Sequence, residues 1–153
     1  GRSTILQLLK VLDDWTEAVD ARLPLDVIYT DFQKAFDSVP HGGLLQKLTS
    51  IGIKGKLHAW IQSFLLNRKQ RVKIKGCTSE WMDVLSGVPQ GSVLGPLLCI
   101  IYINDIVDIL GCHCYLYADD MKLYKIIQSS NDCTALQTDL DRVVEWAVTG
   151  KSN

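Results

Sequence analysis

The sequence lacks an excess of charge of either sign, and it lacks an apolar run long enough to cross a membrane. The 16 Lys and Arg residues against 17 Asp and Glu residues give a formal net charge of −1. Overall charge therefore does not indicate a nucleic-acid partner, which must be inferred from local patches. The longest apolar run, residues 93–103, is interrupted by Gly95 and Pro96, whereas a membrane-spanning helix needs about 20 apolar residues.

The sequence also lacks a cysteine framework and a secretory signal. Its 5 cysteines are an odd number at irregular spacing, which fits a reducing, intracellular compartment. No second cluster at zinc-ligand spacing accompanies Cys112-His113-Cys114, and a structural zinc site needs four ligands. We interpret Cys112 and Cys114 as small buried hydrophobic residues. Charged residues such as Arg2 near the start argue against a signal peptide. Both ends look cut, so we expect an excerpt of a longer protein.

What is present is the composition of one globular domain and a clear helical periodicity. The 153 residues are 47% hydrophobic and 22% charged, which argues against disorder. Ser3 or Thr4 can cap a first helix, Gly52 can end a second, and Asn131 or Asp132 can cap the last. The predicted helices cover residues 4–20, 44–51, 57–65 and 97–110, followed by a last helix with Leu136, Leu140, Val143, Val144 and Ala147 on one face.

Runs of β-prone residues predict the strands. A buried strand is expected at residues 25–30, and strict alternation over residues 71–75 predicts a half-buried strand that returns through a turn at 76–79 to a partner at 80–85. A loop rich in Gly and Pro covers residues 86–95. Two further runs, residues 112–117 and 122–127, predict a hairpin around Asp119 and Asp120. The order of elements predicts an α+β domain with helices on one side of an antiparallel sheet.

Three aspartates stand where strands end or turn. Asp31 follows the first strand, and Asp119-Asp120 lie in the hairpin turn. If these strands are neighbours, the carboxylates converge at one edge of the sheet, and a buried carboxylate is costly unless it is paired or binds metal. Magnesium takes few carboxylates, with phosphates and water completing its coordination. The alternative for each residue alone is ordinary turn chemistry.

Three longer segments resemble one enzyme family. Residues 117–120, Tyr-Ala-Asp-Asp, resemble the tyrosine-X-Asp-Asp box of reverse transcriptases. Residues 31–41, Asp-Phe-Gln-Lys-Ala-Phe-Asp-Ser-Val-Pro-His, resemble their first carboxylate motif, and residues 86–97 resemble the loop and helix between the two. Residues 1–4 and 102–106 also fit the pattern of non-long-terminal-repeat, LINE-type retrotransposons, of the Jockey and chicken-repeat kind.

The resemblance implies a role for each matched position. Asp31, Asp119 and Asp120 would be the catalytic acidic cluster that binds two Mg²⁺ or Mn²⁺ ions, with the carbonyl of Phe32 as a further ligand. Phe36 would reject a 2′-hydroxyl on the incoming nucleotide by its bulk. The nucleotide-binding pocket would also be lined by Gln90 and Gly91.

Alternatives stay open at several of these positions. The alternative for Phe36 is plain core packing, and the alternative for Gly91 is a turn glycine without a binding role. Asp37 can cap a helix, form a salt bridge or touch metal. We expect Tyr117 to support the hairpin or the primer strand.

A basic run provides the local patch that overall charge does not. It comprises Arg68, Arg71, Lys73 and Lys75, of which the last three would share one face of an alternating strand. Such a face suits template or primer phosphates, because backbone neutralisation dominates affinity for nucleic acid. The alternatives are a solvated strand face, or a sheet edge that the lysines protect against aggregation.

As a whole the resemblance implies a partial RNA-directed DNA polymerase. We expect the palm, an antiparallel sheet with a ferredoxin-like core, at residues 25–153, and a helix leading into it from the fingers at residues 1–24. Fingers and thumb would be largely missing. The expected partners are an RNA template, a DNA primer and a deoxynucleoside triphosphate, with a nuclear site of action and no membrane. Residues 149–153 depart from the family pattern, so an inactive remnant that only binds nucleic acid is the alternative.

Overall fold

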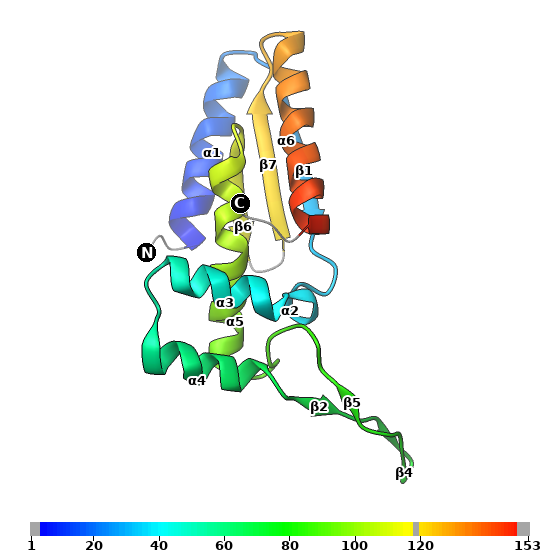
Figure 1. Ribbon diagram of the computed structural model, residues 1–153. Helices are drawn as coiled ribbons and strands as arrows, with labels where there is room; N and C mark the ends of the chain where they lie inside the picture. Colours follow the sequence, from blue (N-terminus) through cyan, green and yellow to red (C-terminus); the bar gives the residue numbers. More distant parts are fainter. Residues whose placement is uncertain (1–3, 118–119, 150–153) are drawn as a thin grey trace. The chain divides into compact units, whose positions relative to one another are not determined.

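The computed structural model of the chain describes residues 4–117 and 120–149 (Figure 1). These residues form two compact units. One unit joins the chain up to Gln33 with the chain from Asp105 onward, and the other is the continuous stretch Lys34–Asn104. Each unit is described by itself.

The first unit is built on a three-stranded antiparallel sheet of order β1-β7-β6. The strands are β1 (Leu25–Asp31), β6 (His113–Tyr117) and β7 (Asp120–Ile126). The predicted pairing of the last two strands is confirmed, and β1 joins β7 along its whole length. No residue of β1 is fully buried, so the prediction of a buried strand is wrong. The reason is that β1 is an edge strand, whereas the central β7 carries the buried Leu123 and Tyr124.

Two long helices pack on this sheet, α1 (Thr4–Asp20) and α6 (Ser130–Thr149). Helix α1 matches its predicted bounds; the proposed cap Ser3 lies outside the described residues. Tyr124 of β7 hydrogen-bonds to Asp14 of α1, whereas the next residue, Lys125, pairs with Asp132 of α6 at 3.8 Å. Successive strand residues point to opposite faces. The helices of this unit therefore cover both faces of the sheet, not one face as predicted.

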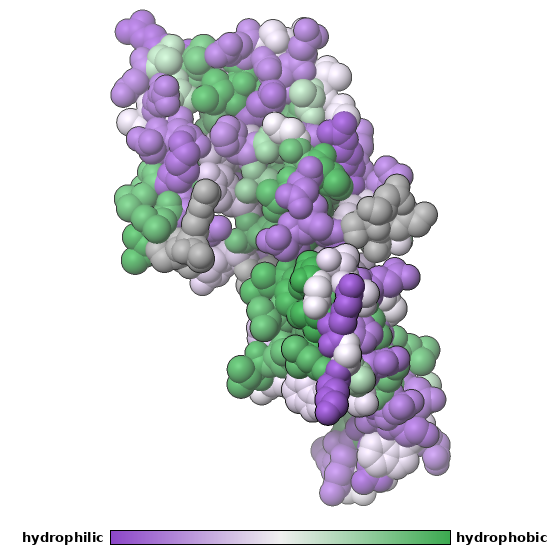
Figure 2. Space-filling model, turned by 60° about the vertical axis from the view of Figure 1, so that its left-hand side comes forward, coloured by the Kyte–Doolittle hydropathy of each residue, from purple (hydrophilic) through white to green (hydrophobic). Residues whose placement is uncertain are grey.

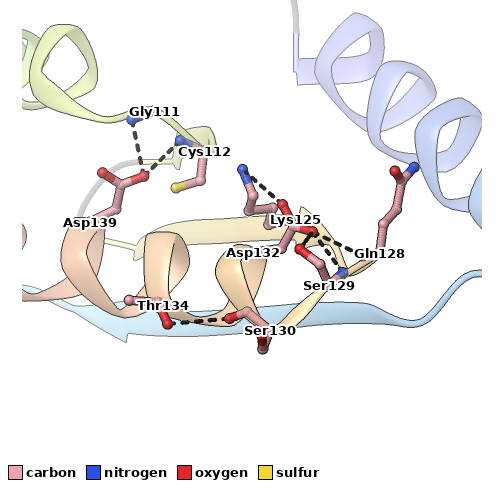
Figure 3. A network of polar contacts seen from close by, with 9 residues as sticks. All are labelled: Gly111, Cys112, Lys125, Gln128, Ser129, Ser130, Asp132, Thr134 and Asp139. Atoms are coloured by element: carbon pink, nitrogen blue, oxygen red, sulfur yellow. Dashed lines mark hydrogen bonds and ion pairs between the residues drawn. The ribbon is translucent and has the colours of Figure 1, made fainter.

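Helix α6 begins slightly earlier than expected and buries a different face. Asp132 lies inside the first turn, where its carboxylate accepts hydrogen bonds from the backbone N–H groups of Gln128 at 3.1 Å and Ser129 at 2.9 Å (Figure 3). The buried positions of the helix are Leu136, Asp139, Val143 and Trp146. Val144 and Ala147 are exposed, so the predicted face was wrong by part of a turn, because a buried aspartate belongs to it.

The second unit is a helical cluster formed by α2 (Ala35–Ser38), α3 (His41–Ser50), α4 (Gly55–Leu65) and α5 (Leu94–Ile103). Helix α3 ends as predicted, since Gly52 adopts φ +92° and Ile53 N–H donates back to the Leu48 carbonyl at 2.8 Å. Helix α5 is shorter than predicted, and the chain tightens into a 3₁₀ helix, η1 (Asn104–Ile109). The core of this unit includes Leu44, Leu48, Ile61, Leu65, Leu98 and Cys99.

A long hairpin completes the second unit (Figure 1). Its pairs are β2 (Lys69–Gln70) with β5 (Met82–Asp83), and β3 (Lys73–Ile74) with β4 (Cys77–Thr78). The predicted half-buried strand is wrong on two counts. The strand is interrupted between Gln70 and Lys73, and every residue of these short strands is exposed. Because no second layer covers either side of the hairpin in the described part of the chain, alternation of side chains does not produce burial there.

Candidate metal and nucleotide site

Two of the three predicted carboxylates lie opposite each other. In the register of β1 and β7, Asp31 pairs with Asp120, and in that of β6 and β7, Tyr117 pairs with the same Asp120. Directly paired residues share a face of the sheet. Like charges opposite each other are destabilising, so this placement favours a cation between or beside the two carboxylates.

These residues suit a hard divalent ion in donor type. Mg²⁺ prefers a small number of carboxylate oxygens and keeps water or phosphate in its other positions. Both carboxylates are exposed, so the expectation that a buried aspartate marks the site is wrong. The described part of the chain contains no group of three or more His, Cys, Asp and Glu residues that could hold a metal. Asp119, the third carboxylate of the predicted cluster, lies outside the described residues.

A pocket of about 600 Å³ adjoins the carboxylates. Both Asp31 and Asp120 line it, together with Tyr117. Its remaining lining comes from α1 and all three strands: Gln7, Leu8, Val11, Tyr29, Thr30, Tyr115, Leu116, Met121 and Lys122. The Lys122 ammonium lies 5.0 Å from the centre of the Tyr29 ring, so a cation–π contact holds one positive charge on the pocket wall.

A buried polar contact fixes α1 to the strand that carries Asp120. The carboxylate of Asp14 accepts hydrogen bonds from the Tyr124 hydroxyl at 2.7 Å and from the Lys10 ammonium at 2.5 Å. Burial alone would raise the pKa of Asp14, but these two hydrogen bonds outweigh it and lower the pKa below its usual value. Burial raises the pKa of Tyr124, and the bond to Asp14 raises it further. Tyr124 therefore stays a neutral donor at physiological pH.

A second buried carboxylate anchors the start of β6, and the sequence did not point to it. Asp139 of α6 accepts hydrogen bonds from the backbone N–H groups of Gly111 at 3.0 Å and Cys112 at 2.8 Å (Figure 3). Arg142 donates to its other oxygen at 2.8 Å. Burial opposes ionisation of Asp139, yet these donors lower its pKa below the usual value. An acidic residue at helical spacing from Leu136 and Val143 was the available signal.

The cysteines behave differently from one another. Cys99 is buried and Cys112 and Cys114 are partly buried, but Cys77 and Cys133 are exposed. The predicted burial of Cys112 and Cys114 is therefore only partial. Burial raises the pKa of Cys112 to about 12, with the Asp139 carboxylate adding to the effect. Burial and Asp139 also raise the pKa of Cys114 to about 11. Both side chains are therefore neutral thiols at neutral pH.

The residues predicted for the nucleotide pocket meet within the second unit. Gln90 donates from its side-chain amide to the Asp37 carboxylate at 2.9 Å, and the Val88 N–H donates to the Phe36 carbonyl at 2.7 Å. Phe36 is half-buried. Gly91 adopts φ +77°, a conformation that favours glycine. The segment from Phe36 and the loop that carries Gln90 thus form one hydrogen-bonded group.

Gly87 is a sterically constrained glycine that the sequence analysis did not single out. It adopts φ +82°, and a Cβ atom there would lie 2.7 Å from the Cα atom of Asp37. No other residue fits without moving the backbone. The close approach of the two segments therefore depends on glycine at this position.

The residues of the basic run differ in their surroundings: Arg68 bonds to backbone carbonyls within the second unit, whereas the others lie on the exposed hairpin. Arg68 donates to the Leu65 carbonyl at 2.9 Å and to the Gly87 carbonyl at 2.5 Å, and burial lowers its pKa. The Arg71 guanidinium lies 4.5 Å from the centre of the Trp81 ring. Lys73 and Lys75 are exposed. Hydrophilic side chains dominate the surface of this hairpin, at the lower end of Figure 2.

No helix among the residues that the structure describes is long and apolar enough to span a membrane.

Comparison with known proteins gives a consistent result. Residues 14–151 match the family described as "Reverse transcriptase (RNA-dependent DNA polymerase)". The RNA-directed DNA polymerase from mobile element jockey of Drosophila funebris is 36% identical over 154 residues, which cover 93% of this chain and 16% of that protein. The probable RNA-directed DNA polymerase from transposon X-element of Drosophila melanogaster is 31% identical, over 96% of this chain and 17% of its own length. The chain thus spans about a sixth of the length of these relatives.

Proposed function

Because the chain belongs to the reverse transcriptase family, we propose that it is the palm region of an RNA-directed DNA polymerase of a non-long-terminal-repeat retrotransposon. The reaction is attack of a primer 3′-hydroxyl on the α-phosphate of a deoxynucleoside triphosphate, with release of pyrophosphate. The template is RNA and the primer is DNA, and the site of action is intracellular, in the nucleus. The parts of the relatives that lie beyond this chain would complete the enzyme.

The observation that carries the proposal is the pairing of Asp31 with Asp120 across β1 and β7. Asp31, Asp119 and Asp120 would hold two divalent ions, and the Phe32 carbonyl would add a ligand. The bound ions would activate the primer hydroxyl and offset charge on the leaving pyrophosphate. The Phe32 ring lies edge-on to Trp146 of α6, 5.9 Å between ring centres. This contact supports the proposal because it fixes the backbone directly after Asp31.

The nucleotide would be selected by residues of the second unit. Phe36 would exclude a 2′-hydroxyl by bulk, and Gln90 and Gly91 would line the pocket. Support comes from the hydrogen bonds that join the segment of Phe36 to the loop of Gln90. The Asp37 carboxylate accepts from the Gln90 amide, so in this arrangement Asp37 orients the pocket rather than binding metal.

The template and primer would contact the exposed basic hairpin and the end of β6. Arg71, Lys73 and Lys75 would neutralise phosphates, and Tyr117, which is 63% exposed, would support the primer. The stacked pair of Arg71 and Trp81 offers both charge and an aromatic face, a combination that suits single-stranded nucleic acid. The palm, with a ferredoxin-like core, would occupy residues 25–153, and α1 would lead into it from the fingers.

The test is primer extension on an RNA template in Mg²⁺ or Mn²⁺. We compare the chain with Asp31→Asn and Asp119→Asn, and use Asp26→Asn, an exposed aspartate of the same strand, as the matched control. The proposal expects extension by the parent and the control, and loss of about 100-fold or more in both carboxylate variants. A different result would favour the binding remnant instead of the polymerase. In that case the folded parent binds nucleic acid but extends no primer, and the binding persists when both aspartates are neutralised.

A further inference from the structure

One backbone carbonyl in the second unit receives two side-chain donors from distant segments. The Gly87 oxygen lies 2.8 Å from Nε2 of His41 and 2.5 Å from a terminal nitrogen of the Arg68 guanidinium. A carbonyl oxygen has two lone pairs, so both donors can be satisfied at once. This arrangement requires a proton on Nε2 of His41. The 3.3 Å approach of Arg68 to the same Nε2 is then a contact between two donors that share one acceptor.

The C-terminal end of helix α4 holds the Arg68 side chain in position. Its Nε donates to the Leu65 carbonyl, at the last residue of α4, over 2.9 Å. A helix C-terminus carries partial negative charge and unpaired carbonyl groups, which stabilise a cation. His41 is 6% exposed, so its ring is also fixed by packing. The side chains of Arg68 and His41 are therefore each held by contacts other than their hydrogen bonds to the Gly87 carbonyl.

The loop that they hold is joined to the segment after Asp31 by further bonds. The Gly87 N–H donates to the Val39 carbonyl at 2.8 Å, and the Ser86 hydroxyl donates to the Asp37 carbonyl at 2.8 Å. Glycine at 87 lets the two backbones approach to a distance that a Cβ atom would prevent. The loop can move away only if these bonds and the contacts to His41 and Arg68 break together.

We propose that Arg68 and His41 are positioning residues that lock residues 86–91 in the conformation needed to bind the incoming nucleotide. Arg68 acts through the Gly87 carbonyl and not on a phosphate of the nucleic acid. Gln90 is three residues beyond Gly87 and is oriented by Asp37, so the lock holds the loop of Gln90 against the segment that carries Phe36. The inference rests on the proposed function for the role of the pocket, but the lock itself does not.

The alternative role for Arg68, a phosphate contact, predicts different measurements. A residue that contacts a phosphate contributes about one unit to the salt dependence of primer–template binding, and its loss weakens binding to all sequences. A residue that holds the nucleotide loop changes the KM for the nucleotide and leaves primer–template affinity unchanged. The two roles therefore separate in one set of variants.

The experiment uses Arg68→Gln, Arg68→Lys and His41→Phe, with Lys56→Gln, an exposed lysine of α4, as the control for lost charge. Hydrogen exchange of the backbone N–H groups of residues 86–91, apart from Pro89, is measured first. Loss of a charge-assisted hydrogen bond should speed exchange by about tenfold or more in Arg68→Gln. A smaller increase in Arg68→Lys, which keeps a donor, and no change in the control are also expected.

Single-nucleotide incorporation is measured on the same proteins. The inference expects the nucleotide KM of Arg68→Gln to rise by about fivefold or more, with primer–template affinity within about twofold of the parent and the salt slope unchanged. Unchanged exchange at 86–91 would overturn the lock whether or not the chain polymerises. If Arg68→Gln leaves the nucleotide KM unchanged but binds nucleic acid more weakly and with a smaller salt dependence, Arg68 contacts a phosphate and the inference is wrong. A parent that incorporates nothing refutes the proposed function, while the exchange result still decides the lock.

Discussion

The hydroxyl of Tyr124 is expected to stabilise the first unit through Asp14, and Tyr124→Phe isolates that contribution. The substitution removes one oxygen and keeps the ring, which is fully buried and packs edge-on against Trp15 at 6.0 Å between ring centres. The Asp14 carboxylate then retains Lys10 but loses its 2.7 Å donor. A hydrogen bond to a charged group contributes about 1.5–3 kcal/mol, so the free energy of unfolding should fall by about that amount at pH 7.

The pH dependence follows from the direction of the Asp14 pKa. The folded-state pKa of Asp14 lies below the usual 3.8, so its contribution to stability is present above the unfolded value and is lost as pH falls through the folded value. The difference between Tyr124→Phe and the parent should therefore shrink as pH falls below 3.8. The assay is urea unfolding at neutral and acid pH, followed by tryptophan fluorescence. As a control, Tyr29→Phe removes a hydroxyl from a side chain that is 67% exposed. Equal losses in both variants, or a loss independent of pH, would refute the reasoning.

Three further predictions concern single positions. Gly87→Ala should lower the free energy of unfolding by about 1–3 kcal/mol, because its Cβ would meet the Asp37 backbone at 2.7 Å. A Cβ at Gly42 meets nothing within 4 Å, so Gly42→Ala should stabilise α3 by about 0.5–1 kcal/mol. Thermal unfolding of both variants tests this contrast. Exposed Cys77 should react with iodoacetamide at pH 8 much faster than Cys112, whose pKa burial raises to about 12; equal labelling by mass spectrometry would contradict the assigned burial. Phe36→Ala should raise incorporation of ribonucleotides relative to deoxyribonucleotides by about tenfold or more, and an unchanged ratio would assign Phe36 to the core.

The sequence predicted the elements that depend on local periodicity. Helix α1 (Thr4–Asp20) begins and ends as expected, and the pairing of β6 with β7 follows from two apolar runs around a short turn. Hydrophobic periodicity did not predict the buried face of α6, because that face includes a charged residue. Asp139 occupies the inner face of α6 because three donors satisfy its carboxylate. A polar residue counted as outward therefore shifted the predicted face toward Val144.

The hairpin shows a second limit of sequence patterns. Alternation over residues 71–75 describes which side chains share a face, but it cannot say whether another layer covers that face. Here no such layer is described, and Ile74 remains 63% exposed. The conformation of Lys75, with φ +47° ahead of Gly76 at φ +87°, closes the turn earlier than the pattern suggested.

Of the candidate site, the sequence predicted the strand pairing that places two of its aspartates opposite each other. The opposition of Asp31 and Asp120 follows from the expectation that the first strand and the hairpin are neighbours. The contacts of Gly87 and Arg68 did not follow from the sequence, because each is made with a segment about 20 to 50 residues away. A basic residue next to other basic residues reads as a phosphate contact until its hydrogen bonds are known.

Divalent-ion binding by the carboxylate pair tests the central claim most directly. Mn²⁺ binding, measured by electron paramagnetic resonance without nucleic acid or nucleotide, reports on Asp31 and Asp120 independently of polymerisation. The account predicts binding by the parent, affinity reduced about tenfold or more in Asp31→Asn and Asp120→Asn, and parental affinity in Asp26→Asn. Equal Mn²⁺ affinity in the parent, both carboxylate variants and the control would contradict the assignment of these aspartates to the metal site.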